Sequence, residues 1–140
     1  MAIEVLENLA NLATVATFVL EFRSDLPLVG LTGIINRIRG RLTPAQTEAL
    51  ERPGAEAIIG VLVIDPDLLD DLKRELAGCT EKYRKRLKGG SRSDRDAADH
   101  QAERCVCEIL NRIRRRNKGV LPGDLADPWQ SYKCVEDWDY

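Results

Sequence analysis

The sequence predicts an all-α fold, namely a compact single-domain bundle of about six or seven helices that ends in a short acidic aromatic C-terminal tail. Three observations lead to this prediction. Apolar residues recur at steps of three and four over long stretches, which is the helical period. Residues that start and stop helices flank these stretches. A single segment has the composition of a strand, and no other segment offers it a partner strand.

The composition is that of one globular domain covering residues 1–140, with residues 119–140 docked on it as the tail. Of the 140 residues, 44% are hydrophobic and 31% are charged. This balance excludes a disordered chain and a polytopic membrane protein. Aromatic residues make up only 5%, so we expect an aliphatic core. A chain of this length can bury about two-thirds of its unfolded surface, so it needs no covalent cross-links to fold.

The first expected helix runs from Ile3 to Phe22 and contains neither glycine nor proline. Its apolar residues form a wide stripe, so we expect it to be buried in the core or at an interface. A membrane span needs about 20 continuous apolar residues. Here polar residues interrupt the stretch, namely Glu4, Glu7, Asn8, Asn11 and Glu21. Shallow membrane attachment through residues 3–22 is kept as the least favoured function.

The middle of the chain predicts three further helices. The first covers residues 31–42. The second starts at Thr43 and Pro44, where Gln46 can complete a capping box, and it ends near residues 53–54. Residues 55–64 read AEAIIGVLVI, a composition that suits a buried strand or a buried helix. We predict a helix, because a lone strand would leave its backbone groups without hydrogen bonds.

The second half of the chain predicts three more helices. Asp65 and Pro66 start a helix with a leucine stripe, and Gly78 is expected to end it. The acids near its start suit capping and the helix dipole better than a metal site. Thr80 is expected to cap a basic helix that ends at the glycine pair 89–90. Asp94 is expected to cap the last long helix, which covers residues 95–117.

Charge is distributed unevenly along the chain. Residues 81–118 contain thirteen bases and six acids, a net charge of +7, and residues 119–140 contain one base and five acids, a net charge of −4. Seven basic residues are candidates for phosphate contacts in a nucleic-acid-binding subunit of a larger complex: Arg84, Lys85, Arg86, Arg112, Arg114, Arg115 and Arg116. The alternative is a solvated face that the acidic segments partly neutralise. The sequence contains no helix-turn-helix, RNP or GXXG motif.

The four cysteines and the single histidine do not predict a metal site. In a helix, Cys105 and Cys107 point about 200° apart, and His100 and Cys107 lie about 10.5 Å apart along the axis. Zinc ligands must all reach one centre at about 2.0–2.3 Å, so we expect neither a metal nor a cofactor. The first residues are acidic where a secretory signal would be basic, so we expect a cytoplasmic protein with reduced thiols. If the thiols were oxidised, the sequence could not choose among the three possible pairings.

The sequence contains no P-loop, GxGxxG, GxSxG or HExxH motif, so we expect no enzymatic activity. The tail holds both tryptophans of the chain, and its aromatic residues are the candidate partner-binding residues: Trp129, Tyr132, Trp138 and Tyr140. Trp129 is expected to pack within the chain, and Trp138 and Tyr140 to face a partner. The favoured function is a small non-enzymatic interaction or adaptor module that acts through helix faces and this tail. Its partner is a second protein or a second copy of the chain.

Overall fold

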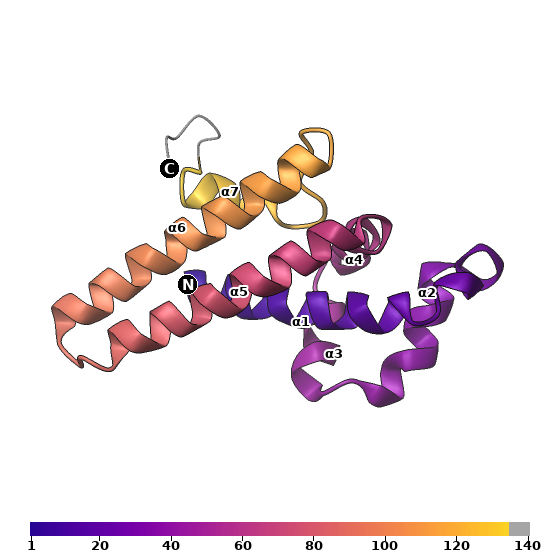
Figure 1. Ribbon diagram of the computed structural model, residues 1–140, viewed down its shortest axis with the longest axis horizontal. Coiled ribbons are helices and arrows are strands. Elements are labelled where there is room, and N and C mark those ends of the chain that lie inside the picture. Colours follow the sequence, from indigo (N-terminus) through magenta and orange to yellow (C-terminus); the bar gives the residue numbers. More distant parts are fainter. Residues whose placement is uncertain (135–140) are drawn as a thin grey trace.

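The computed structural model describes residues 1–134. Over these residues it contains seven α-helices, two short 3₁₀ segments and no strand (Figure 1), which confirms the all-α prediction. The helices are α1 (Ala2–Leu20), α2 (Leu26–Ile38), α3 (Pro44–Glu51), α4 (Ala55–Ile64), α5 (Pro66–Leu87), α6 (Arg92–Arg116) and α7 (Ala126–Ser131). The 3₁₀ segments are η1 (Arg23–Asp25) and η2 (Arg39–Arg41).

Helix α1 is the central element of the fold and contacts each helix from α2 to α6. In Figure 1, α5 and α6 cover one side of α1 and α2 lies at its C-terminal end. Ala45 and Glu48 of α3 line a hollow with Glu4 in the N-terminal half of α1. Its buried stripe is fully aliphatic: Ala2, Leu6, Leu9, Leu12, Ala13, Val15, Ala16 and Val19. The other helices supply the facing side chains, among them Ile34, Ile58 and Leu72. Removing this apolar surface from water is the dominant favourable term that holds the helices together.

Residues 55–64 form helix α4, as the sequence predicted. The segment turns Ile58, Ile59 and Leu62 into the core, where each is at most 1% exposed. A helix satisfies its own backbone groups, so this apolar segment can be buried without a partner strand. Helix α3 also begins as predicted, because Thr43 accepts a hydrogen bond from the Gln46 amide and the Gln46 side chain accepts one from the Thr43 amide.

Helix α2 differs from the prediction. It starts at Leu26 rather than near residue 31, and it ends at Ile38, where η2 follows. Gly30 interrupts its first part with φ 72° and ψ 173°. Glycine adopts this conformation at little cost, so the chain can turn here and continue as a helix. The fully buried residues of α2, namely Ile34, Ile35 and Ile38, all lie after the kink, and Leu26 before it is partly buried against the core.

Three boundaries in the second half of the chain were predicted wrongly. Gly78 does not end a helix and Thr80 does not start one, because α5 runs unbroken over 22 residues. The Thr80 hydroxyl instead donates to the Leu76 carbonyl within the same helix. Helix α6 begins one turn earlier than expected, since Ser91 is its cap: the Ser91 hydroxyl accepts from the Asp94 amide, and the Asp94 carboxylate accepts from the Ser91 amide.

Helices α5 and α6 form a long antiparallel hairpin whose closed end projects beyond the N-terminus of α1 (Figure 1). A disulfide between Cys79 and Cys105 joins the two helices, with 6.2 Å between their Cα atoms. A second disulfide joins Cys107 of α6 to Cys134 after α7, with 5.1 Å between the Cα atoms. All four cysteines are therefore paired, which contradicts the expectation of reduced thiols.

The segment that follows α6 folds back onto the bundle. Leu125 is 2% exposed and belongs to the core, and Asp124 forms an ion pair with Arg52 at 3.1 Å. The backbone of Gly123 lies so close to Gly54 that a Cβ atom on either glycine would overlap the other. The C-terminal segment is thereby fastened to the turn between α3 and α4.

Candidate interaction surfaces

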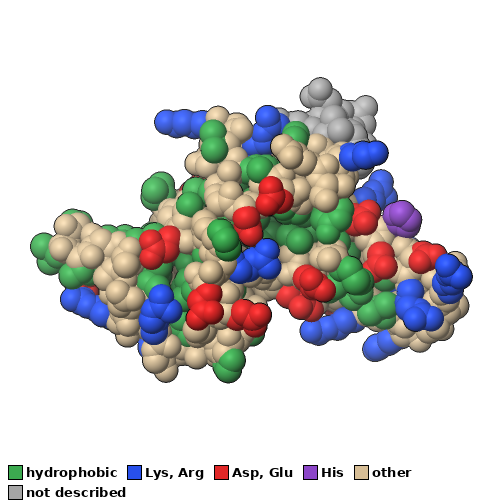
Figure 2. All heavy atoms as spheres, turned by 180° about the vertical axis from the view of Figure 1, so that it is seen from behind, with side chains coloured by type: hydrophobic (Ala, Val, Ile, Leu, Met, Phe, Trp, Pro, Cys, Tyr) green, Lys and Arg blue, Asp and Glu red, His purple; other side chains and the backbone are tan. Residues whose placement is uncertain are grey.

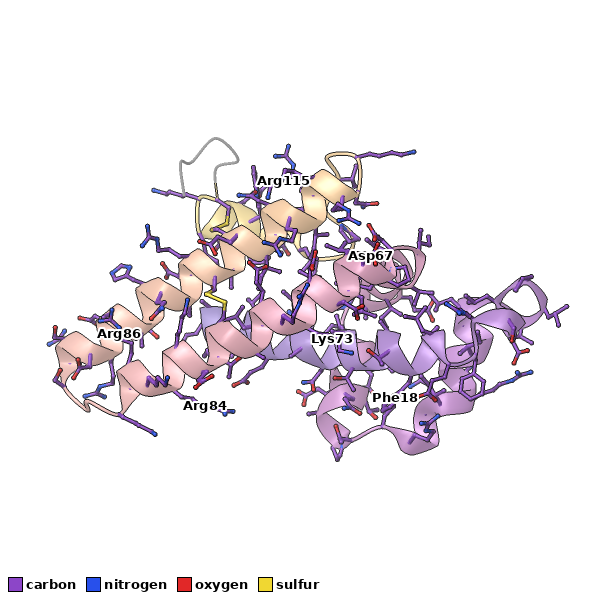
Figure 3. All side chains as sticks on the ribbon, viewed as in Figure 1. Phe18, Asp67, Lys73, Arg84, Arg86 and Arg115 are labelled. Carbon is purple, nitrogen blue, oxygen red and sulfur yellow. A yellow bond between two sulfur atoms is a disulfide. The ribbon has the colours of Figure 1, made fainter. Side chains whose placement is uncertain are left out.

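The basic residues predicted to bind phosphate lie in two separate groups. Arg84, Lys85 and Arg86 lie in the last turn of α5, while Arg112 to Arg116 lie in the last turns of α6. The 25-residue helix α6 separates the groups, and it is about 37 Å long at 1.5 Å per residue. Figure 3 labels Arg86 at one end of the hairpin and Arg115 at the other.

Three of the four arginines at the α6 end hold the fold together. Arg116 binds both carboxylate oxygens of Asp65 at 2.7 and 3.0 Å, and Arg112 pairs with Glu75 at 3.0 Å. Arg114 donates to the Gly119 carbonyl and lies over the Trp129 ring, 4.9 Å from its centroid. Within residues 1–134, Arg115 makes no ion pair. This group therefore has little free charge to offer a ligand.

Glu75 of α5 pairs with Arg112 of α6 through one carboxylate oxygen, and its second carboxylate oxygen is buried with no hydrogen-bond partner among residues 1–134. Burial is the largest influence on this group and raises the pKa of Glu75 above its usual value. The guanidinium of Arg112 acts in the opposite direction, while the charges of Glu108 and Asp71 add to the rise. The burial penalty outweighs the ion pair, so Glu75 is costly to the fold when it is ionised.

The aromatic residues of the tail that the structure describes face the chain itself. The Trp129 indole N–H donates to the side-chain oxygen of Asn111, which is fully buried in α6, at 2.8 Å. Tyr132 is half-buried, and desolvation together with the charges of Glu103 and Glu4 raises its pKa. These contacts fasten α7 to α6. Trp138 and Tyr140 lie outside the described residues, and partner binding by the four aromatic residues remains a prediction.

The closed end of the hairpin, residues 81–96, is called the hairpin tip from here on. It carries seven exposed cations against three acids: Lys82, Arg84, Lys85, Arg86, Lys88, Arg92 and Arg95 face Glu81, Asp94 and Asp96. Lys85 pairs with Glu81 at 3.4 Å, and the other six cations form no ion pair with any residue in the described range. Figure 2 shows blue side chains gathered at this end of the molecule, near the single histidine.

An open groove of about 670 Å³ lies between α1 and α5. We call it the α1–α5 groove. Small or apolar side chains form most of its lining, and two cations and one acid complete it: Ala10, Ala13, Thr14, Leu76, Ala77, Thr80, Lys73, Glu81 and Arg84. Figure 3 labels Lys73 and Arg84 along α5.

Sequence reasoning missed this groove. Lys73, Ala77, Thr80 and Arg84 are separated by four, three and four residues, so they form one stripe in a continuous helix. The signal was present, but the predicted break at Gly78 divided the stripe between two helices. The apolar pattern before Gly78 does not indicate whether the helix ends at this glycine or continues past it.

Helix α1 is long and apolar enough to cross a membrane by length and composition alone. In the structure its apolar stripe faces the core, with Leu6 and Val15 fully buried. Over residues 1–134, no three His, Cys, Asp or Glu side chains are arranged to hold a metal ion. His100 is 82% exposed and lies 3.9 Å from Glu103. No protein-family model, curated protein or solved structure matches the chain.

Proposed function

We propose that this chain is a non-enzymatic protein–protein interaction module that binds an amphipathic helix of a partner in the α1–α5 groove. The observation that carries the proposal is the groove itself, which has a volume of about 670 Å³ and lies between two helices whose other faces pack in the hydrophobic core. Because Leu12 of α1 and Leu72 of α5 are each 1% exposed, both walls are held by core packing. A preformed, rigid groove lowers the entropic cost of binding.

The lining of the groove favours an apolar helix face. The Thr14 hydroxyl donates to the Ala10 carbonyl and the Thr80 hydroxyl donates to the Leu76 carbonyl. Because these hydroxyls are already bonded within their own helices, the two threonines can turn their methyl groups toward a ligand. Ala77 is exposed in the groove and has almost no side chain to obstruct an approaching helix.

The charges of the groove favour an acidic partner helix. Lys73 and Arg84 lie eleven residues apart on one stripe of α5, which corresponds to about 16 Å along the helix. The one acid in the lining, Glu81, is already paired with Lys85. A partner helix of three to four turns with carboxylates near its two ends would place an anion near each cation. Such complementary charges set the orientation and speed of binding more than its strength.

The experiment selects ligands from a displayed library of helical peptides of about 14 residues that have an apolar face and variable end positions of Glu, Lys or Ala. We expect the chain to enrich peptides with Glu near both ends. Ala77→Trp fills the groove without touching the core and is expected to weaken the selected peptides at least tenfold. Ala57→Trp is the matched control, because Ala57 is an exposed alanine of α4. Enrichment of basic ends, or equal weakening by both variants, would contradict the proposal.

The membrane alternative has less support. Insertion of residues 3–22 into a bilayer would require α1 to expose the stripe that now contacts the other helices, including Leu6, Leu12 and Val19, all at most 1% exposed. Binding in the α1–α5 groove leaves this stripe in place. Co-flotation of the folded chain with neutral lipid vesicles would favour the membrane alternative instead.

A further inference from the structure

We propose that the hairpin tip is a second binding site, which holds the phosphate backbone of double-stranded nucleic acid without reading its sequence. This site adjoins the α1–α5 groove, with which it shares Glu81 and Arg84, and it takes a different ligand. Of the seven residues predicted to contact phosphate, the site keeps only Arg84, Lys85 and Arg86. It adds cations that the prediction omitted, including Arg92 and Arg95 at the start of α6.

The hairpin tip has free positive charge and the rest of the molecule is acidic. The tip carries a net charge of +4 over residues 81–96 and the chain carries −2, so the remaining residues carry −6. Six of the seven tip cations have no ion-pair partner within residues 1–134. A molecule polarised in this way would approach a polyanion tip first, because the field of the acidic part opposes every other orientation.

Helix stability explains only some of these cations. Arg84, Lys85 and Arg86 lie in the last turn of α5, where positive charge suits the helix dipole. Arg92 and Arg95 lie in the first turn of α6, where the dipole disfavours positive charge. Neither arginine forms an ion pair within residues 1–134, and the Ser91–Asp94 capping box already satisfies the helix start. An anionic ligand at the tip accounts for their presence.

The geometry of the tip suits a duplex backbone. Packed helix axes lie about 8–10 Å apart, and long Arg and Lys side chains on α5 and α6 extend this span toward the roughly 12 Å width of a major groove. Four of the seven cations are arginines, whose planar guanidinium can bind two phosphate oxygens at once. Side chains from the two helices can therefore contact phosphates of both strands.

The same residues argue against base recognition and against a lipid surface. Tyr83 is the only aromatic residue of the tip, and its ring is partly buried and packs against the hydrophobic core, so little of it is free to stack on bases. The large apolar side chains that the structure exposes lie away from the tip: Met1, Leu28, Val29, Ile64 and Val120. Stable adsorption to a bilayer usually adds an apolar face to the basic one.

The experiment measures binding of the full chain to a fluorescent duplex of about 20 base pairs by anisotropy, between about 50 and 200 mM salt. The tip variant combines four charge-removing substitutions: Arg86→Gln, Lys88→Gln, Arg92→Gln and Arg95→Gln. It spares Arg84, which also lines the α1–α5 groove, so peptide binding in that groove is expected to persist. The control variant removes four exposed cations elsewhere, with the same change in net charge: Arg23→Gln, Arg104→Gln, Arg115→Gln and Lys118→Gln.

We expect the tip variant to bind the duplex at least tenfold more weakly at about 100 mM salt, and its salt slope to fall by about 3 to 4, since each phosphate contact contributes about 0.9. The control should stay within about threefold of the unmodified chain, and two unrelated duplex sequences should bind equally. Absence of duplex binding by the unmodified chain at about 50 mM salt would overturn the proposal. So would equal loss in both variants, or tip-dependent binding to phosphatidylserine vesicles that exceeds binding to the duplex.

Discussion

The disulfide between Cys79 and Cys105 makes a quantitative prediction about stability. Replacing both residues with alanine releases a loop whose ends are 26 residues apart. In the chain-entropy model, closing a loop of this size lowers the entropy of the unfolded chain by about 12 cal/mol/K, or about 3.5 kcal/mol at 25 °C. Whole domains are stable by about 5–15 kcal/mol, so this one cross-link accounts for a large share of the stability.

Urea unfolding followed by circular dichroism measures the effect. With a slope of about 1.5–2 kcal/mol/M, a loss of about 3.5 kcal/mol lowers the midpoint by about 2 M urea. The comparison variant is Cys107→Ala with Cys134→Ala, which opens a loop of nearly equal size, 27 residues. It should lose a similar amount of free energy. Because this second bridge fastens the segment after α7, its loss should also shift the tryptophan emission to longer wavelength.

Alkylation and mass spectrometry test the premise directly. The chain purified without reductant should carry no free thiol, and peptide mapping should recover the Cys79–Cys105 and Cys107–Cys134 pairs. Four alkylated cysteines in the folded chain would refute the reasoning. A shift of less than about 1 kcal/mol in the first double variant would refute the loop-entropy account while leaving the pairing intact.

Three further predictions concern single side chains. Trp129→Phe removes the indole N–H that donates to the buried Asn111 and should cost about 1–3 kcal/mol in urea unfolding. Burial raises the pKa of Glu75 in the folded state, so the unmodified chain should lose stability as pH rises above 4.5 and this carboxyl ionises. Glu75→Gln lacks this loss, so its free energy of unfolding relative to the unmodified chain should increase with pH. Urea unfolding from pH 4 to pH 7 measures the difference. Gly54→Ala should cost more than about 2 kcal/mol, since φ is 78° and the new Cβ would overlap Gly123.

Each of these three predictions has an outcome that would contradict it. Gly40→Ala is the control for the glycine, because a Cβ there meets nothing within 4 Å; equal costs at both positions would show that the close approach is unimportant. Parallel pH profiles of the unmodified chain and Glu75→Gln would mean that the carboxyl titrates as it does in the unfolded chain. Unchanged stability of Trp129→Phe would show that Asn111 is satisfied without the indole.

Capping residues predicted helix starts correctly where the hydrogen bonds that form the cap are local. The capping box at Thr43 and the restart at Asp65 are as predicted, because each depends on side chains within three residues. The break at Gly78 failed for a tertiary reason. A glycine costs a helix interior only about 1 kcal/mol, and the neighbouring Leu76 and Cys79 are anchored against the rest of the bundle. Packing and the cross-link therefore carry the helix across Gly78.

The candidate sites were less accessible to sequence reasoning. The pairing of four cysteines cannot be deduced from spacing, because three pairings are possible and only the antiparallel hairpin brings Cys79 beside Cys105. The basic segment was treated as one surface. The structure divides it into two groups. Arg112 pairs with Glu75 of α5, 37 positions earlier in the chain, and Arg116 pairs with Asp65, the N-cap of α5, 51 positions earlier. Periodicity reports which residues share a helix face, and it does not report what lies opposite.

The central place of α1 has a consequence for how the chain is made. Helix α1 is synthesised before the helices that cover it, α2 to α6, and the last of these is complete only at Arg116. Until then the apolar stripe of α1 lacks part of its native packing partners and is exposed, so chaperones can bind it during translation. Nascent chains stalled before α6 should therefore remain bound to chaperones. Chains that include α6 should be released from the chaperones when the α5–α6 hairpin packs over α1.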